Sequence, residues 1–316
     1  MRQQSSSSSA GGAASSGTAS HGWTTVLLLA VPPLCWATNF VVGRAVRDDI
    51  PPMMLSTARW GIALLCLLPF TWRAVRRDLP RYWQLRWQVL RCAVVGVAAF
   101  NTLIYAGLHW TTASNALLLN SFIPILIALF GVLLYGQRMH GLQAAGMALS
   151  FLGVLNIALH GEWARLAALS FSRGDLLVFA AMVCWALYTL WLRRMPADLD
   201  RVAFTTMQIA LAVLVLVPLY GWEYSTGARP VWGPAAVGAM LFVGLVPSVL
   251  AYLVYAAGVA RAGPARAGLF LHLMPVFGAV LSVVFLRESL HLYHAAGMAA
   301  IFGGIAIASM RRASSR

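Results

Sequence analysis

The sequence predicts an all-α polytopic membrane protein with ten transmembrane helices, arranged as two inverted five-helix repeats. Three observations support this fold class. Apolar residues make up 60% of the chain and charged residues only 10%, too few to cover the surface of soluble domains. The apolar residues form continuous runs of about 20, enough to cross a hydrocarbon core as a helix, whereas a β-barrel has shorter, alternating segments. Two stretches also recur at a fixed spacing, which indicates a duplicated unit.

Ten apolar runs follow one another along the chain, and prolines, glycines or arginines punctuate the sequence between them. Each run is predicted to be one membrane-spanning helix, numbered here as spans one to ten. The predicted spans are 23–42, 52–71, 90–110, 115–135, 141–160, 175–193, 202–221, 235–257, 265–285 and 292–310.

The duplication is visible as two repeated runs of letters. CWATNFVVGRA at Cys35–Ala45 returns as CWALYTLWLRR at Cys184–Arg194, and AAGMA at Ala144–Ala148 returns at Ala295–Ala299. The same register places Pro124 on Pro275 and Gly153 on Gly304. Because five spans is an odd number, the second copy must insert in the opposite sense, which is the inverted repeat typical of secondary transporters.

The repeat divides the chain into four parts. Residues 1–22 are rich in Ser, Ala and Gly and are expected to form a disordered cytoplasmic tail. The two five-helix repeats are expected over 23–160 and 175–310, and 311–316 form a second cytoplasmic tail.

The arginines predict the orientation. All 23 basic residues are Arg. With the N-terminus inside, 16 of them fall on the inner side and six on the outer side, while Arg59 lies within a span. The positive-inside rule therefore places both termini in the cytoplasm of a multi-pass protein, and we expect a bacterial cytoplasmic (inner) membrane. The net charge of +14 follows from these loops and is not taken as a sign of nucleic-acid binding.

The order of several segments resembles the drug/metabolite transporter superfamily, specifically its ten-span EamA-type members. The segments are CWATNFVVGR in span one, STARW around Arg59, NTLIYAGLHW from Asn101, and CWALYTL with LMPVFGAVLSVVFLRESL in the second half. The resemblance implies secondary transport of metabolites, often export. It also implies a central cavity lined by spans one to four and six to nine, with spans five and ten at the periphery.

Polar and aromatic residues at helical spacing suggest which helix faces line such a cavity. A charge within a span is a functional candidate by default, and the guanidinium of Arg59 suits a carboxylate or a phosphate. The alternative for Arg59 is snorkelling or bonding to a neighbouring helix, and for the other residues it is helix–helix packing. The candidate substrate-binding residues are Trp36, Asn39, Arg59, Asn101, Tyr105, Asn120, Trp185, Tyr188, Ser248, Tyr252 and His272.

Two further features bear on mechanism and packing. No Asp or Glu occupies the middle of a span, and His272 is the one buried group expected to titrate near neutrality; a neutral, hydrogen-bonded His is the alternative. Glycines give spans five and ten small faces, which we expect to pack inside the bundle rather than between subunits. These glycines are Gly146, Gly153, Gly297, Gly303 and Gly304.

The sequence offers no enzymatic chemistry. Its four cysteines lack metal-ligand spacing, and no nucleophile–base pair or phosphate loop is recognisable, so we expect no enzyme activity, metal or cofactor. The predicted function is a secondary transporter that exports amino acids or similar amphipathic metabolites by alternating access. The alternatives are a sugar-phosphate or drug-type exchanger and a membrane-embedded transferase. The expected partners are a small-molecule substrate and the lipid bilayer, while a monomer and a homodimer both remain open.

Overall fold

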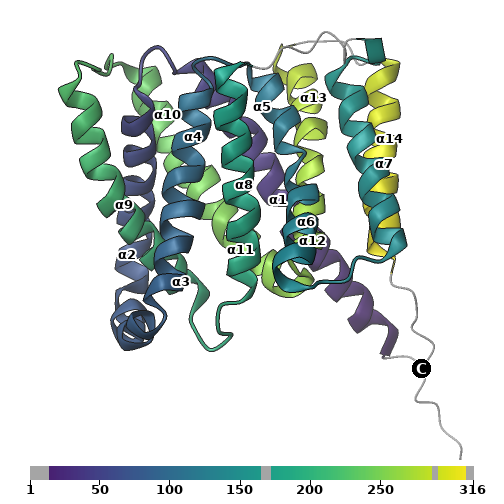
Figure 1. The fold of residues 1–316 in the computed structure, drawn as a ribbon, viewed down its shortest axis with the longest axis horizontal. Coiled ribbons are helices and arrows are strands. Elements are labelled where there is room, and N and C mark those ends of the chain that lie inside the picture. Colours follow the sequence, from purple (N-terminus) through teal and green to yellow (C-terminus); the bar gives the residue numbers. More distant parts are fainter. Residues whose placement is uncertain (1–13, 165–171, 287–290, 311–316) are drawn as a thin grey trace, which may run out of the picture.

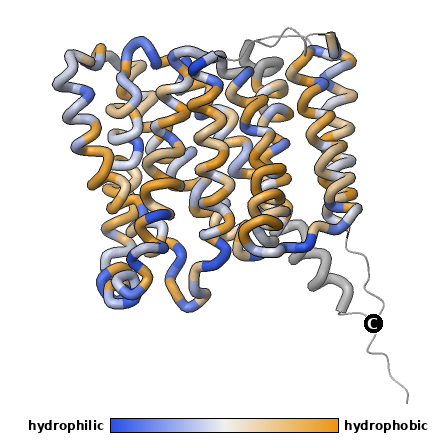
Figure 2. Tube along the Cα trace, in the orientation of Figure 1, coloured by the Kyte–Doolittle hydropathy of each residue, from blue (hydrophilic) through white to orange (hydrophobic). Residues whose placement is uncertain are grey.

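The structure is a computed structural model that describes residues 14–164, 172–286 and 291–310. In this part of the chain the helices stand side by side in one bundle (Figure 1). Ten helical stretches are long and apolar enough to cross a membrane, and apolar residues predominate along them while hydrophilic residues gather at the turns (Figure 2). The predicted all-α fold with ten spans is confirmed, and the protein is a multi-pass membrane protein.

The first five spans contain seven α-helices and one π-helical segment: α1 (Ala14–Ala45), α2 (Pro52–Gln84), α3 (Arg86–Arg91), η1 (Cys92–Ala99), α4 (Phe100–Gly107), α5 (Ala113–Asn120), α6 (Ile123–Tyr135) and α7 (Gly141–Ala158). The other five contain seven α-helices, a π-helical segment and a 3₁₀ turn: α8 (Arg173–Arg193), α9 (Arg201–Ser225), α10 (Pro234–Gly244), η3 (Leu245–Leu250), α11 (Ala251–Ala262), α12 (Pro264–Leu269), η4 (Phe270–His272), α13 (Leu273–Leu286) and α14 (Leu292–Ser309).

Two helices exceed their predicted bounds. Helix α1 begins at Ala14, within the predicted disordered tail 1–22; the rest of that tail, 1–13, lies outside the described residues. Helix α2 continues to Gln84, past the predicted end of the span at residue 71. The extension of α2 is rich in Arg, which favours the helix even where the sequence is no longer apolar. The added residues of α1, 14–22, are mainly Ser, Gly and Thr, so local propensity does not explain its early start.

The chain passes through the two halves in opposite directions. We call the lower side in Figure 1, where α1 begins and α14 ends, the terminal face, and the upper side the opposite face. Helix α1 runs from the terminal face upward, whereas its repeat counterpart α8 runs from the opposite face downward (Figure 1). The two five-helix repeats are therefore inverted, as an odd number of spans requires.

Four spans are interrupted, and the interruptions occur at equivalent places in the two halves. Spans three and eight each contain a π-helical segment, η1 and η3. Span four breaks between α5 and α6, just before Pro124, and span nine breaks at η4, just before Pro275. Because proline lacks a backbone N–H and clashes with the preceding turn, it favours such a break. Discontinuous helices at the repeat interface are typical of transporter binding sites.

Helices α7 and α14 form a separate pair at one end of the bundle (Figure 1). A Cβ atom on Gly153 would lie 2.6 Å from the carbonyl oxygen of Gly297, and one on Gly297 would lie 2.7 Å from that of Gly153. Gly146 and Gly304 face each other in the same way. Only glycine permits this approach of two backbones, so the predicted packing inside the bundle is confirmed for these four glycines, whereas a Cβ atom on Gly303 would meet nothing nearer than Leu149 at 3.8 Å.

Candidate functional site

A small pocket lies between the two halves of the bundle. Its volume is about 10 Å³, close to the least space that one water molecule needs. In this conformation the pocket therefore has no room for a molecule larger than water. The pocket is lined by Trp36, Asn39, Phe40, Phe100, Asn101, Ile104, Asn120, Ile123, Trp185, Leu271 and Met274.

Several residues that line the pocket are equivalent in the two repeats. In the register of the repeated runs, three pairs of equivalent residues line it: Trp36 with Trp185, Asn120 with Leu271, and Ile123 with Met274. The rings of Trp36 and Trp185 meet edge to face, with their centroids 4.9 Å apart. Equivalent residues from both halves thus line one pocket between the repeats.

The two halves contribute different chemistry to the pocket. The first half supplies three amides, from Asn39, Asn101 and Asn120, whereas the second half supplies only Trp185, Leu271 and Met274. The amide of Asn101 donates to the Val97 carbonyl and the Tyr252 hydroxyl, both at 3.2 Å. That of Asn120 donates to the Met274 sulfur at 3.0 Å, a weak acceptor. We call the first-half side, where the three amides lie among five apolar residues, the polar wall, and the second-half side, where the Trp185 indole N–H is the polar group, the apolar wall.

Arg59 lies immediately behind the polar wall and is only 1% exposed. Its Nε donates to Ser248 Oγ at 2.5 Å, and its terminal nitrogens donate to Asn39 Oδ1 at 3.0 Å, Tyr105 Oη at 2.8 Å and the Pro247 carbonyl at 3.1 Å. All four acceptors are neutral, so no counter-charge accompanies these bonds. Asn39 and Tyr105 belong to the first half and Pro247 and Ser248 to the second, so this guanidinium joins the two halves.

The acceptors around Arg59 depend on the irregular backbone of η3. Pro247 has no N–H to donate to the preceding turn, and the hydroxyl of Ser248 donates instead to the Val243 carbonyl at 2.6 Å. The Pro247 carbonyl accepts from both Arg59 and the indole N–H of Trp36, the latter at 2.9 Å. A proline within span eight therefore helps to fix a tryptophan and an arginine of the first half.

An aromatic layer borders the pocket on the side of the terminal face. The ring of Trp185 lies 5.2 Å from Tyr188, 5.3 Å from Tyr252 and 5.2 Å from Tyr255. The hydroxyl of Tyr255 hydrogen-bonds Thr189 at 3.1 Å. Aromatic pairs at these separations stabilise one another beyond simple burial, so the layer is a cohesive barrier.

His272 lies outside this pocket lining. Its Nε2 lies 2.9 Å from the Ser121 carbonyl and its Nδ1 2.6 Å from Ser150 Oγ. A carbonyl can only accept, so Nε2 carries a proton, and a neutral ring then accepts from the serine hydroxyl at Nδ1. His272 connects the break in span nine to the break in span four and to α7. In the register of the repeat, Ser121 is the residue equivalent to His272.

The predicted site residues therefore fall into three groups. Five line the central pocket: Trp36, Asn39, Asn101, Asn120 and Trp185. Five lie one layer behind it: Arg59, Tyr105, Tyr188, Ser248 and Tyr252. His272 is bonded to spans four and five instead.

Sequence reasoning missed the apolar part of the lining and the Pro247 carbonyl. The missed side chains are Phe40, Phe100, Ile104, Ile123, Leu271 and Met274. Apolar residues inside an apolar span carry no signal of their own, but the repeat register pairs Leu271 with the predicted site residue Asn120. The proline at Pro247 within span eight indicates that a carbonyl of the preceding turn lacks its usual N–H donor. Among the described residues, no group of three His, Cys, Asp or Glu side chains is placed to hold a metal ion.

Known proteins with similar sequences are transporters. The model of the EamA-like transporter family matches residues 23–159 and 172–310. The "Uncharacterized transporter YyaM" of Bacillus subtilis (strain 168) is 30% identical over 265 residues, which cover 81% of this chain and 84% of that protein. A "Probable terminal-alkyne amino-acid exporter" of Streptantibioticus cattleyicolor is 26% identical, over 83% of this chain and 86% of its own.

Two further comparisons agree with this fold. A "Probable amino-acid metabolite efflux pump" of Escherichia coli (strain K12) is 24% identical, over 86% of this chain and 90% of its own. A solved crystal structure superposes with a TM-score of 0.69 at 22% identity, covering 90% of this chain and 96% of that one; at that identity the likeness concerns the fold. The family model matches both halves, and the chain therefore belongs to the EamA-like transporter family.

Proposed function

We propose that this protein is a secondary transporter that exports small amphipathic compounds carrying a carboxylate, with amino acids as the leading class. The observation that carries the proposal is the central pocket, which has three amides on the wall from the first half and none on the wall from the second, where Trp185, Leu271 and Met274 lie. A zwitterion with an apolar side chain matches both walls at once. The names of two relatives, an amino-acid exporter and an amino-acid metabolite efflux pump, support the same class.

Arg59 supports an anionic group on the cargo. A buried guanidinium with only neutral acceptors keeps an unbalanced positive charge in a medium where charge is costly. When the halves separate, the bonds from Arg59 to Pro247 and Ser248 must break. A carboxylate can then replace both acceptors through a bidentate contact. A sugar-phosphate exchanger would be expected to place several cations at the pocket, and the described pocket has Arg59 alone behind its wall.

We further propose that the terminal face is cytoplasmic and that the protein resides in the bacterial inner membrane. The α2–α3 region on this face carries Arg73, Arg76, Arg77, Arg81, Arg86 and Arg91, and the positive-inside rule assigns such a loop to the cytoplasm. Alternating access then moves cargo from the terminal face, through the central pocket, to the opposite face.

Uptake into liposomes tests the proposal. Purified protein is reconstituted and offered aromatic and aliphatic amino acids, together with the corresponding amines that lack the carboxylate. We expect accumulation of the amino acids and little of the amines. If the protein moves no member of the panel in either direction, the proposal is wrong.

A matched pair of variants links transport to the pocket. Asn101→Ala removes an amide from the polar wall, and we expect uptake to fall sharply. Asn156→Ala removes an amide from the peripheral pair α7–α14, where the side chain donates to the Tyr293 carbonyl at 2.8 Å; we expect uptake to remain near wild type. Equal uptake by the two variants would dissociate transport from this pocket.

A further inference from the structure

A second and larger cavity opens at the terminal face. Its volume is about 160 Å³, similar to a protein cavity of about 150 Å³ that binds benzene. It lies among the end of α8, the connection to α9, the start of α9 and the end of α11. The cavity is lined by Leu192, Arg193, Met195, Pro196, Ala197, Leu199, Arg201, Phe204, Thr205, Ala256 and Ala260.

The lining combines an apolar interior with two cations. Leu192, Met195, Leu199 and Phe204 give it apolar walls, while Arg193 and Arg201 contribute guanidinium groups. Arg193 donates to the Ala260 carbonyl at 2.9 Å and so holds its charge beside the cavity. No acidic residue belongs to the lining.

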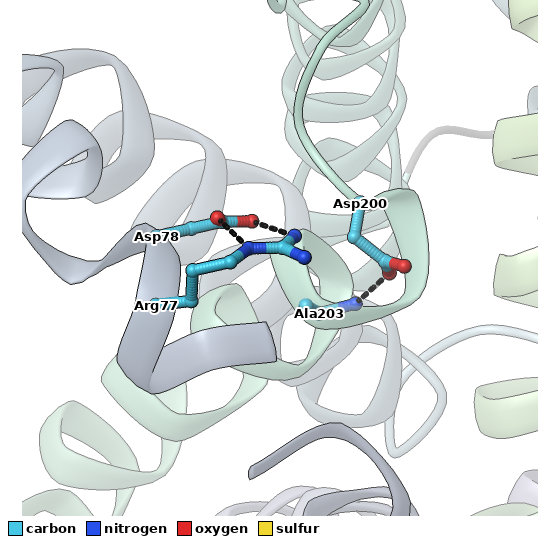
Figure 3. A network of polar contacts seen from close by, with 4 residues as sticks. All are labelled: Arg77, Asp78, Asp200 and Ala203. Carbon is cyan, nitrogen blue, oxygen red and sulfur yellow. Dashed lines mark hydrogen bonds and ion pairs between the residues drawn. The ribbon is translucent and has the colours of Figure 1, made fainter. Parts of the chain in front are cut away.

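Two acidic groups in this region, Asp78 and Asp200, have partners of their own (Figure 3). Asp200 caps α9 by accepting from the backbone N–H of Ala203 at 2.8 Å, and Asp78 pairs with Arg77 at 2.7 Å. Within the described residues, ion pairs form only at Arg47–Asp48 and Arg77–Asp78. Both cavity arginines therefore lack an ionic partner in the described part of the chain and are available to an anion.

The cavity is separated from the central pocket by the aromatic layer. Its wall residue Ala256 directly follows Tyr255, whose ring lies 5.2 Å from both Trp36 and Trp185. Those two tryptophans line the central pocket. One layer of rings, tied by the Tyr255–Thr189 hydrogen bond, thus lies between the two spaces.

We propose that this cavity is a second binding site, which takes a carboxylate-bearing compound with an apolar group the size of a phenyl ring or smaller. The apolar group occupies the space bounded by Leu199 and Phe204, and the carboxylate meets Arg193 and Arg201. The site receives cargo at the terminal face before the aromatic layer opens to the central pocket. This inference rests on the proposed function, because it assigns the same class of cargo to a second place in the chain.

Binding stoichiometry tests the second site. L-Phenylalanine is titrated against the purified full-length protein by equilibrium dialysis, with phenethylamine as the analogue that lacks the carboxylate. We expect two phenylalanines per chain and weaker binding of phenethylamine. Leu199→Trp fills the cavity and should leave one bound phenylalanine per chain. If this variant fails to fold, Ala260→Leu fills the cavity from another wall.

Charge variants test the role of the arginines. We expect the double variant Arg193→Gln/Arg201→Gln to raise the Kd of one of the two binding events by about tenfold, because charge-assisted hydrogen bonds to the carboxylate are lost. Arg194→Gln is the matched control, because its guanidinium lies over the Tyr135 ring, 3.7 Å from the centroid, and is not part of the lining. The control should bind two phenylalanines with wild-type affinity.

The outcomes separate this inference from the proposed function. Suppose that the wild type binds one phenylalanine per chain, that neither cavity-filling variant changes this number, and that uptake proceeds. This result overturns the second site and leaves the transport proposal intact. Absence of both binding and uptake across the amino-acid panel overturns both. Loss of one binding event in a filled variant that retains the other establishes the second site.

Discussion

Arg59 and Gln208 occupy the same position in the two repeats and behave differently. Each is the eighth residue of its helix, α2 and α9 respectively, and each is buried. Arg59 donates to residues of both halves. The Nε2 of Gln208 donates to the Phe204 carbonyl of its own helix at 3.3 Å, and its Oε1 has no hydrogen-bond partner.

This difference matters because the two positions lie toward opposite faces of the membrane. Arg59 ties the halves together on the side of the opposite face, and the equivalent position toward the terminal face forms no such tie. The 160 Å³ cavity lies at the terminal face. An inverted repeat with identical halves would look the same from both sides, so Arg59 and Gln208 are one source of the difference between the two sides.

Other equivalent positions have kept their symmetry. Gly146 meets Gly304 as Gly153 meets Gly297. Arg44 donates to the Leu108 carbonyl at the end of span three, as Arg193 does to the Ala260 carbonyl at the end of span eight. The scaffold of the two halves is therefore symmetric, whereas the centre of the molecule is asymmetric.

The largest effect is expected where the scaffold is symmetric and tight. In Gly304→Val the new Cβ meets the Gly146 carbonyl and lies 2.6 Å from the Ser150 nitrogen, so α7 and α14 must separate, at a cost of about 3 kcal/mol. Gly303→Val is the control on the same helix, since its Cβ has nothing nearer than Leu149 at 3.8 Å. Fluorescence-detected size exclusion should show loss of folded protein for the first variant alone; equal yields would contradict the packing.

The second effect concerns the asymmetric centre. Arg59→Gln copies the residue of the second repeat and removes the bonds between the halves. Hydrogen bonds to a charged group contribute about 1.5–3 kcal/mol, so we expect a clearly lower thermal unfolding midpoint and uptake reduced by at least about tenfold. Arg59→Lys keeps the charge but lacks the planar guanidinium, so its unfolding midpoint and its uptake should lie between those of the wild type and Arg59→Gln. Wild-type uptake and stability in Arg59→Gln would remove the basis for the asymmetry.

The third effect concerns the two walls of the pocket. Asn120→Leu gives the polar wall the residue that the second repeat has at Leu271. Because the Asn120 amide bonds only a sulfur atom, we expect little loss of stability, while the KM for amino-acid uptake rises several-fold. The double exchange Asn120→Leu with Leu271→Asn moves the amide to the other wall, and recovery of a low KM would show that its position is unimportant.

The smallest effect is expected at Gln208. Replacing it by leucine removes a buried oxygen without a partner, which is neutral or stabilising when the shape is conserved. We expect the unfolding midpoint of Gln208→Leu to equal or slightly exceed that of the wild type. A marked decrease would reveal a role for this side chain in another conformation.

The fold was largely predictable, and the site only partly so. Apolar runs, arginine positions and repeated letters predicted ten spans and their inversion, since these depend on composition along the chain. The polar lining was predictable because Asn39, Asn101 and Asn120 are conspicuous in hydrocarbon. The placement of His272 away from the pocket was not, because a helical face cannot be assigned across the 3₁₀ turn η4 that ends at this residue.

The sequence by itself determined the number of spans, the duplication and its inversion, because hydrophobic length and the parity of five spans leave no other arrangement. Tertiary structure alone decided that Trp36 and Trp185 touch, that Arg59 joins the halves through Pro247 and Ser248, and that the central pocket is small while a cavity opens at the terminal face. These features depend on how distant segments pack and on backbone carbonyls that breaks in helices leave without an intrahelical partner. Neither property can be read from residues that are adjacent in the sequence.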